Sequence, residues 1–187
     1  KRFSQAKGLY GRCFGIVGFG HIGREVAKRA QAMGMRVIAW SRSLTPDLAQ
    51  SWGVECASSL EALAREADVV SVHLPKSEHT IKLLSENFFA HLKNEALLVN
   101  VSRGGIVDEK ALLPFLEKTS IRYATDVFDK EPTSGDDEFN HPLCEHERSL
   151  CTPHIGAATL QAQESVAREV VRIVESYKKE GAVPNVV

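Results

Sequence analysis

The sequence has little net charge, no long apolar run and no closely spaced cysteine pair. Its 24 acidic and 23 basic residues leave a formal net charge of −1, so composition gives no reason to expect a nucleic acid or an anionic membrane as a partner. It contains no run of about 18 apolar residues and no signal-peptide pattern. We therefore expect no membrane span and a cytoplasmic location.

Cysteine is scarce, with four residues that show no C-x-x-C spacing: Cys13, Cys56, Cys144 and Cys151. A disulfide framework is not expected at this length and density. Free thiols in a reducing compartment are the simplest account. We assign no residue to a metal ion.

The 187 residues are 43% hydrophobic and 25% charged, which is ordinary for a globular domain. Short apolar runs alternate with longer amphipathic segments. The runs predict strands at 14–18, 36–40, 68–72, 95–101, 121–127 and 150–152. The amphipathic segments predict helices at 22–33, 60–66, 108–118 and 157–179, with short helical segments ending near Trp52 and His91.

Three helix starts carry N-capping residues, at Ser58 or Ser59, at Ser85 and at Asp108. The segment 130–147 is rich in Pro, Gly, Asp and His, and predicts a loop. Repeated strand–helix alternation predicts an α/β fold, with a Rossmann-type doubly wound parallel sheet and three α/β/α layers.

The segment Gly18-Phe19-Gly20-His21-Ile22-Gly23 has the pattern G-x-G-x-x-G. It follows an apolar strand directly and opens a helix, which is the context that gives the pattern meaning. In this context the first glycine permits a tight turn, the second lets the backbone approach a pyrophosphate, and the third lets helix and strand pack closely. The helix N-terminus then offers N–H groups to the phosphates. We expect a dinucleotide here.

The residues after the second strand bear on which dinucleotide binds. An acidic residue at that point holds a ribose 2′-hydroxyl and disfavours a 2′-phosphate. This chain has Ser41-Arg42 instead, and a hydroxyl with a guanidinium suits a phosphate. Both NAD(H) and NADP(H) therefore stay open as cofactors.

Polar groups also follow three further apolar strands, within 99–105, 126–132 and 152–158. Since parallel strands end at one edge of a sheet, Arg103, Glu131 and His154 are expected to gather there. Such a set suits reduction of a 2-keto acid. The arginine grips the carboxylate and polarises the carbonyl, the histidine exchanges a proton with the alkoxide oxygen, and the glutamate orients the imidazole.

Five motifs in succession resemble the signatures of the D-2-hydroxyacid dehydrogenase family. They are V-G-F-G-H-I-G, V-H-L-P-K-S-E-H-T, L-V-N-V-S-R-G-G-I-V-D, D-V-F-D-K-E-P and T-P-H-I-G-A-A-T. The resemblance implies that Arg103, Glu131 and His154 are the catalytic trio, and that Asp126 approaches the nicotinamide carboxamide. The expected cofactor-binding residues are Gly18, Gly20, His21, Ile22, Gly23, Ser41, Arg42, His73, Leu74, Pro75, Thr80, Val101, Ser102, Arg103, Asp126, His154 and Gly156.

The segments 6–12 and 37–46 look most like phosphoglycerate dehydrogenase-type members of this family. Hydroxypyruvate and glyoxylate reductases remain alternatives. A corepressor-like module that senses a dinucleotide is an alternative of another class. The resemblance further implies a small 2-hydroxy or 2-keto acid substrate and a homodimer formed through this domain.

Family members carry a substrate-binding domain before the glycine fingerprint, whereas only 17 residues precede Gly18 here. The first residue is Lys1 rather than methionine. We therefore expect residues 1–187 to be an excised dinucleotide-binding domain that binds cofactor and turns over poorly or not at all by itself.

Overall fold

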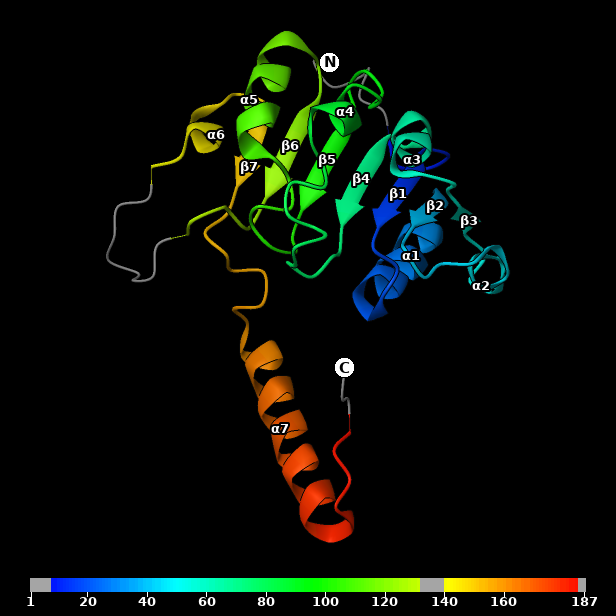
Figure 1. Ribbon diagram of the computed structural model, residues 1–187, viewed down its shortest axis with the longest axis vertical. Coiled ribbons are helices and arrows are strands. Elements are labelled where there is room, and N and C mark those ends of the chain that lie inside the picture. Colours follow the sequence, from blue (N-terminus) through cyan, green and yellow to red (C-terminus); the bar gives the residue numbers. More distant parts are fainter. Residues whose placement is uncertain (1–7, 132–139, 185–187) are drawn as a thin grey trace. The chain divides into compact units, whose positions relative to one another are not determined.

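A computed structural model of the chain describes residues 8–131 and 140–184 (Figure 1). It contains two compact units, the first ending at Thr152 and the second beginning at Pro153. Each unit is described by itself.

Among its described residues, the first unit forms a seven-stranded sheet in which neighbouring strands all run parallel. The strands are β1 (Cys13–Val17), β2 (Arg36–Trp40), β3 (Glu55–Cys56), β4 (Val69–Val72), β5 (Leu97–Asn100), β6 (Arg122–Thr125) and β7 (Ser149–Cys151). Their order in the sheet is β3-β2-β1-β4-β5-β6-β7. The order reverses between β1 and β4, which confirms the doubly wound Rossmann-type fold.

Helices cover both faces of this sheet. The first unit has α1 (His21–Ala32), α2 (Pro46–Ser51), α3 (Leu60–Glu66), α4 (Glu86–Phe89), α5 (Glu109–Lys118) and α6 (Pro142–Glu145). Helices α1 and α2 join the buried cluster that contains Ile16, and the other helices join the cluster that contains Val17. Because adjacent strand residues point to opposite faces, these clusters are the two interlayer cores, and the three-layer prediction is confirmed.

Two of the predicted caps form as expected. The side chain of Ser59 accepts a hydrogen bond from the Ala62 amide at 3.1 Å, and that of Asp108 accepts from the Ala111 amide at 3.4 Å. Ser85 occupies the N-cap of α4 but makes no capping side-chain bond there.

Two short elements were not predicted. Strand β3 has only two residues, too few to show an alternating pattern. Helix α6 lies inside the segment 130–147 that was predicted to be a loop, so that prediction was wrong for Pro142–Glu145. The ring of His141 caps α6, since its Nδ1 accepts from the Leu143 amide at 3.3 Å, and histidine was not considered as a cap. The part of this loop at 132–139 lies outside the described residues.

The second unit contains α7 (Leu160–Glu180). The predicted start at Ala157 was three residues early, because the side chain of Thr159 caps the helix by accepting from the Ala162 amide. Gly181, in a left-handed conformation with φ 66°, ends it. Across the described parts of both units, no helix is long and apolar enough to cross a membrane.

Candidate functional site

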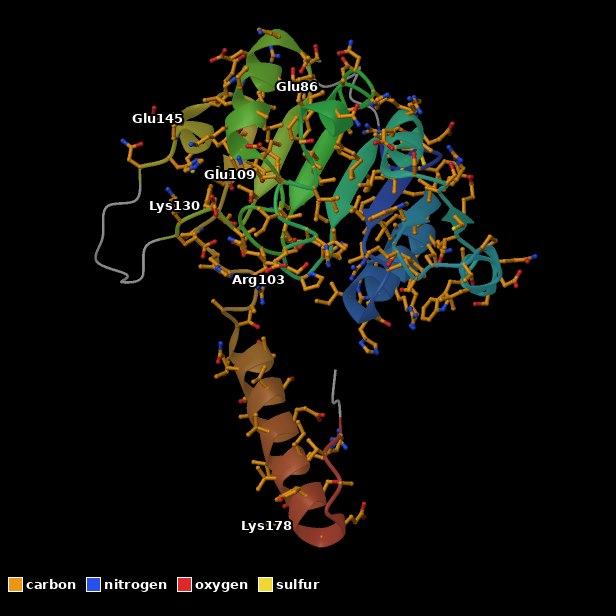
Figure 2. All side chains as sticks on the ribbon, viewed as in Figure 1. Glu86, Arg103, Glu109, Lys130, Glu145 and Lys178 are labelled. Carbon is orange, nitrogen blue, oxygen red and sulfur yellow. The ribbon has the colours of Figure 1, made fainter. Side chains whose placement is uncertain are left out.

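The predicted site residues of the first unit lie at one edge of the sheet, here called the carboxyl edge, where β1, β2, β4, β5 and β6 end. Figure 2 shows Arg103 at this edge, beyond the arrowheads of the strands, with Lys130 of a following loop on the same side of the unit. A doubly wound sheet places ligands in the crevice at this edge, so the carboxyl edge is the candidate site.

The glycine fingerprint forms the turn between β1 and α1. Gly18 has φ +99°, and a Cβ there would lie 2.3 Å from the carbonyl oxygen of His73. A Cβ on Gly23 would lie 2.2 Å from the carbonyl oxygen of Gly18. A Cβ on Gly20, by contrast, would meet nothing within 4 Å. Two of the glycines are thus required by the protein's own packing, whereas Gly20 leaves open space in front of the turn.

That open space faces the start of α1, where the backbone N–H groups are available. Gly20 is the N-cap and offers no side-chain cap, and the first turn of α1 carries no acidic residue. His21 and Ile22 are exposed there. A helix N-terminus with this composition suits an anion, because neither a capping side chain nor an acidic residue of the first turn occupies it. The fit to a pyrophosphate therefore rests on Gly20 and on the uncapped turn.

Ser41 and Arg42 follow β2 on the other side of the fingerprint. Ser41 is half-buried in a turn whose Leu44 amide bonds the Ser41 carbonyl, and Arg42 is exposed. The Gly18 amide bonds the Trp40 carbonyl at 2.8 Å, so the end of β2 lies directly beside the glycine turn. Ser41 and Arg42, which were expected to discriminate between the two dinucleotides, therefore follow a strand end that lies beside the glycine turn.

The segment 73–80 follows β4 and contacts the glycine turn, since the His73 amide bonds the Val17 carbonyl at 2.7 Å. The ring of His73 lies 2.9 Å from the Ser71 hydroxyl, and burial lowers the pKa of this imidazole. Leu74 also packs beside Gly18. The Thr80 hydroxyl donates to the Pro75 carbonyl at 2.7 Å. Thr80 is buried and so holds the shape of this segment from within.

The loop 101–105 follows β5 and carries Arg103; it is here called the arginine loop. The buried side chain of Asn100 holds its shape. The Asn100 amide group donates to the Arg103 carbonyl at 3.1 Å, and its oxygen accepts from the Ser102 hydroxyl at 2.8 Å. Arg103 and Val101 are exposed, and the guanidinium of Arg103 donates to the Ser102 carbonyl at 2.7 Å. Asn100 was not assigned a role from the sequence, although its position at the end of an apolar strand was a usable signal.

After β6, Asp126 is buried and accepts a hydrogen bond from the Thr152 hydroxyl. Five residues later, the carboxylate of Glu131 accepts from the Phe128 amide at 2.7 Å. Asp126 and Glu131 therefore both lie at the carboxyl edge, each with a partner that fixes its orientation.

The arginine loop and the Glu131 loop touch each other. A Cβ on Gly104 would lie 1.8 Å from the Phe128 carbonyl oxygen and 2.6 Å from the Asp129 amide nitrogen. Only a glycine permits this approach. The structure thus brings the segments that carry Arg103 and Glu131 into direct backbone contact.

His154 and Gly156 belong to the second unit. His154 has φ +53°, a backbone conformation that residues other than glycine adopt rarely. Such strain is often concentrated at functional positions. The predicted trio is therefore divided, with Arg103 and Glu131 in one unit and His154 in the other, and their meeting stays a prediction.

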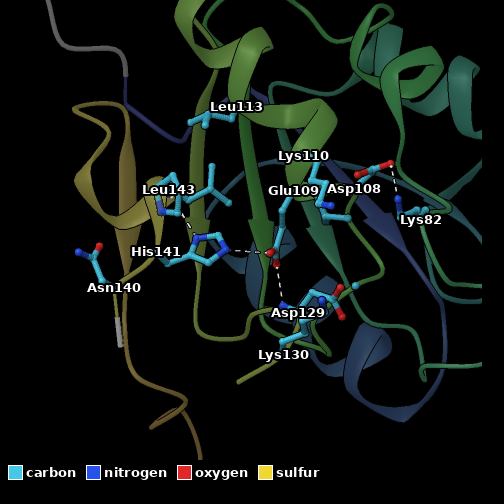
Figure 3. Close-up of a pocket in the computed structure, with 13 residues that line it drawn as sticks. Lys82, Asp108, Glu109, Lys110, Leu113, Asp129, Lys130, Asn140, His141 and Leu143 are labelled. Atoms are coloured by element: carbon cyan, nitrogen blue, oxygen red, sulfur yellow. Dashed lines mark hydrogen bonds and ion pairs between the residues drawn. The ribbon is translucent and has the colours of Figure 1, made fainter. Parts of the chain in front are cut away.

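A cavity of about 590 Å³ lies between α5, α6 and the Glu131 loop (Figure 3). The sequence did not predict it. Glu109, at the first position of α5, is buried beside it, 3.2 Å from the His141 Nε2 atom. Burial raises the pKa of Glu109 to about 7 and lowers the pKa of His141.

The glycine turn, the uncapped helix start and the sheet order together define a dinucleotide-binding domain of the Rossmann type. The model of the D-isomer specific 2-hydroxyacid dehydrogenase NAD binding domain matches residues 1–156. The chain belongs to this family.

Relatives and solved structures agree with that assignment. The chain is 35% identical to D-3-phosphoglycerate dehydrogenase of Methanocaldococcus jannaschii, over 100% of the chain and 36% of the relative. It is 37% identical to glyoxylate reductase of Thermococcus litoralis, over 96% and 53%. The structure of D-lactate dehydrogenase with NAD+ from Lactobacillus jensenii aligns with a TM-score of 0.84 at 26% identity, over 97% of this chain and 57% of that one. The chain thus spans between about a third and about half of these proteins.

Proposed function

We propose that this chain is the cofactor-binding part of a D-2-hydroxyacid dehydrogenase that transfers a hydride between a nicotinamide dinucleotide and a 2-keto acid. One observation carries the proposal: the glycine turn leaves open space at Gly20 on the same carboxyl edge where the Arg103 and Glu131 loops are held together. The proposed cofactor site and the proposed reaction site therefore lie at the same edge of the sheet.

The nicotinamide dinucleotide, when bound, supplies the hydride. The turn at Gly18, Gly20 and Gly23 holds its phosphates with the N-terminus of α1. Segment 73–80, the residues Val101 and Ser102, and Asp126 contribute the remaining contacts in this proposal, with Gly156 of the second unit.

Arg103 grips the substrate carboxylate through two parallel hydrogen bonds and polarises the carbonyl. His154 gives a proton to the carbonyl oxygen as it becomes an alkoxide. Glu131 accepts a hydrogen bond from the other ring nitrogen, which fixes the tautomer and favours the protonated imidazole. Each of these groups is of the type that its step requires.

Phosphoglycerate is the first substrate to test, because curated D-3-phosphoglycerate dehydrogenases are among the relatives. Glyoxylate and hydroxypyruvate are the second, because relatives named glyoxylate reductase match equally long parts of the chain. The exposed Arg42 after β2 supports use of NADPH beside NADH. We propose further that the protein is a cytoplasmic homodimer, which cell fractionation and analytical ultracentrifugation test.

The deciding experiment is a substrate screen of the full-length protein with NADH and with NADPH. Oxidation of either cofactor by 3-phosphohydroxypyruvate, hydroxypyruvate or glyoxylate is the expected result. Binding of a dinucleotide by calorimetry without turnover of any 2-keto acid would instead favour a dinucleotide-sensing module. Absence of both binding and turnover would overturn the proposal.

A further inference from the structure

Glu109 is a buried carboxylate outside the groups assigned to the reaction. It occupies the first position of α5, and only 9% of the residue is exposed. Both of its oxygens have partners: Oε1 accepts from the Asp129 amide at 3.1 Å, and Oε2 lies 3.2 Å from His141 Nε2. Figure 3 shows these two contacts converging on Glu109 from different elements. A buried carboxylate that accepts two hydrogen bonds is held in one position and orientation.

The peptide that Glu109 binds is the one where the two candidate loops meet. Gly104 approaches the Phe128–Asp129 peptide so closely that a Cβ would overlap the Phe128 carbonyl oxygen. Glu109 accepts the N–H of the same peptide. This peptide is therefore held by the arginine loop through contact and by α5 through a hydrogen bond.

Both predicted reaction groups lie within a few residues of that peptide. Arg103 directly precedes Gly104, and Glu131 is bonded to the Phe128 amide at 2.7 Å. A shift of the Phe128–Asp129 peptide would therefore move Glu131 and loosen the packing of the arginine loop together. In contrast, the glycine turn after β1 makes no contact with Glu109 among the interactions of the described residues.

We propose that Glu109 is a positioning residue, which fixes the Phe128–Asp129 peptide and thereby the spacing between Arg103 and Glu131. The inference rests on the proposed function and adds a residue to it. His141 holds the second carboxylate oxygen of Glu109. Its Nδ1 accepts from the Leu143 amide, so its ring proton lies on Nε2 and is donated to Glu109.

Because both partners of Glu109 are donors, an amide cannot replace the carboxylate. In Glu109→Gln the single amide oxygen can accept from either the Asp129 amide or His141 Nε2. The NH₂ group then faces the other donor, with which it cannot form a hydrogen bond. The substitution keeps size and shape, so it tests the charge and the acceptor count alone.

Several charges face Glu109 and set its response to pH. The pKa of Glu109 is raised to about 7, mainly by burial; the hydrogen bond from the Asp129 amide lowers this pKa, the carboxylates of Asp129 and Glu131 raise it, and Lys76 lowers it. The surrounding cavity wall adds Lys82, Asp108, Lys110 and Lys130, with Lys82 and Asp108 paired at 3.3 Å. The acceptor strength of Glu109 therefore changes near neutral pH, and the positioning of the two loops changes with it.

The kinetic test compares Glu109→Gln with wild type in the full-length enzyme, using the cofactor that the wild type uses. We expect kcat to fall by about 10- to 100-fold, which is the scale for a small misplacement of reacting groups. The KM for the keto acid should rise, while the KM for the dinucleotide changes by less than about twofold. The part of the pH–rate profile that changes near pH 7 through Glu109 should be lost, whereas the part that depends on proton transfer by His154 should remain.

Asp108→Ala is the matched control, because it removes the N-cap of the same helix without contacting Asp129. A loss of thermal stability, with kcat within about twofold of the wild-type value, is the expected result. If the two variants have the same kinetics, Glu109 acts only on stability and the positioning proposal is wrong.

A readout without turnover follows the Asp129 amide by NMR in ¹⁵N-aspartate-labelled full-length protein, assigned through its loss in Asp129→Asn. In wild type this signal should titrate near pH 7, and in Glu109→Gln that titration should vanish. His141→Asn can still cap α6 but removes the donor to Glu109, so the titration should move to higher pH. His141→Gln restores a donor and should move it back.

The outcomes separate the two proposals. A titrating Asp129 amide in a protein that turns over no 2-keto acid supports the contact and overturns the proposed function. Turnover by wild type together with an Asp129 amide that titrates identically in Glu109→Gln overturns the positioning role.

Discussion

The turn after β1 and the turn after β5 both depend on glycine, but the glycines of the two turns differ in what surrounds them. In the first turn, Gly23 closes against Gly18, Gly18 closes against His73 after β4, and Gly20 faces open space. In the second, Gly104 closes against Phe128, which lies 24 residues further along the chain and beyond another strand. The first turn thus keeps one glycine that nothing in the described chain approaches, whereas the glycine of the second turn is needed for a contact between two loops.

In the proposed function, this difference separates the turn that binds the dinucleotide from the loops that carry Arg103 and Glu131. The glycine turn is held by residues at the ends of β2 and β4, namely Trp40 and His73. A pair of loops that hold each other, with Glu109 fixing their shared peptide, depends on α5 and α6 as well. Changes far from the substrate are therefore expected to affect the Arg103–Glu131 region more than the cofactor turn.

The largest effect is expected from Arg103→Ala, which removes the cation without disturbing either turn. We expect kcat/KM for the keto acid to fall by about 10³-fold, the upper scale for loss of one group that stabilises a developing oxyanion. The free energy of unfolding should change by no more than about 0.5 kcal/mol, because the side chain is exposed. Steady-state kinetics and urea unfolding measure the two quantities. Unchanged kinetics on every 2-keto acid would remove Arg103 from the site.

The second effect is structural and concerns Gly104→Ala. The added methyl group would overlap the Phe128 carbonyl, so the two loops have to separate. A loss of about 3 kcal/mol in the free energy of unfolding is expected, at the upper scale for overpacking, with loss of activity. Equal stability of the variant and wild type in urea would show that the loops do not hold each other.

The third effect is a pH dependence of stability that arises from Glu109. Burial raises its pKa from an ordinary 4.5 to about 7, so the native state binds this proton more tightly than the unfolded chain does. Stability from this group is therefore complete below about pH 4.5 and is lost as the pH rises to about 7, by about 3 kcal/mol.

Urea unfolding of wild type and Glu109→Gln between pH 4.5 and pH 8 isolates this contribution. The wild type should lose stability relative to the variant across that window. Parallel curves would mean that Glu109 titrates alike in the folded and unfolded chain.

The smallest effect is expected from Gly20→Ala, the matched partner of Gly104→Ala. Since a Cβ at Gly20 meets nothing within 4 Å, stability should change by no more than about 0.5 kcal/mol. Dinucleotide affinity should fall by about tenfold or more, equivalent to about 1.4 kcal/mol, because the methyl group occupies the space left for the phosphates. Calorimetry with NADH and NADPH tests this, and unaltered affinity would place the phosphates elsewhere.

Local patterns explain what the sequence could predict. Strand β2 and helix α3 were predicted with their observed bounds, and the glycine turn was predicted at its observed place between a strand and a helix, because periodicity and spacing are local properties. Glu109 and Asn100 were not assigned roles. Their importance depends on partners that the fold brings near, the Asp129 amide for one and the arginine loop for the other. Helix α6 was not predicted because its cap is a histidine ring, which is not among the usual capping side chains.

The sheet order has a consequence for how the protein behaves at high concentration. Its two outermost strands are the shortest, with β3 reduced to two residues and β7 to three. An outer strand exposes unpaired N–H and C=O groups that another chain can extend, and a short one offers few of them. The interior strands that are long and apolar are paired on both sides. The first unit is thereby protected from joining other molecules sheet to sheet, the usual first step toward aggregates.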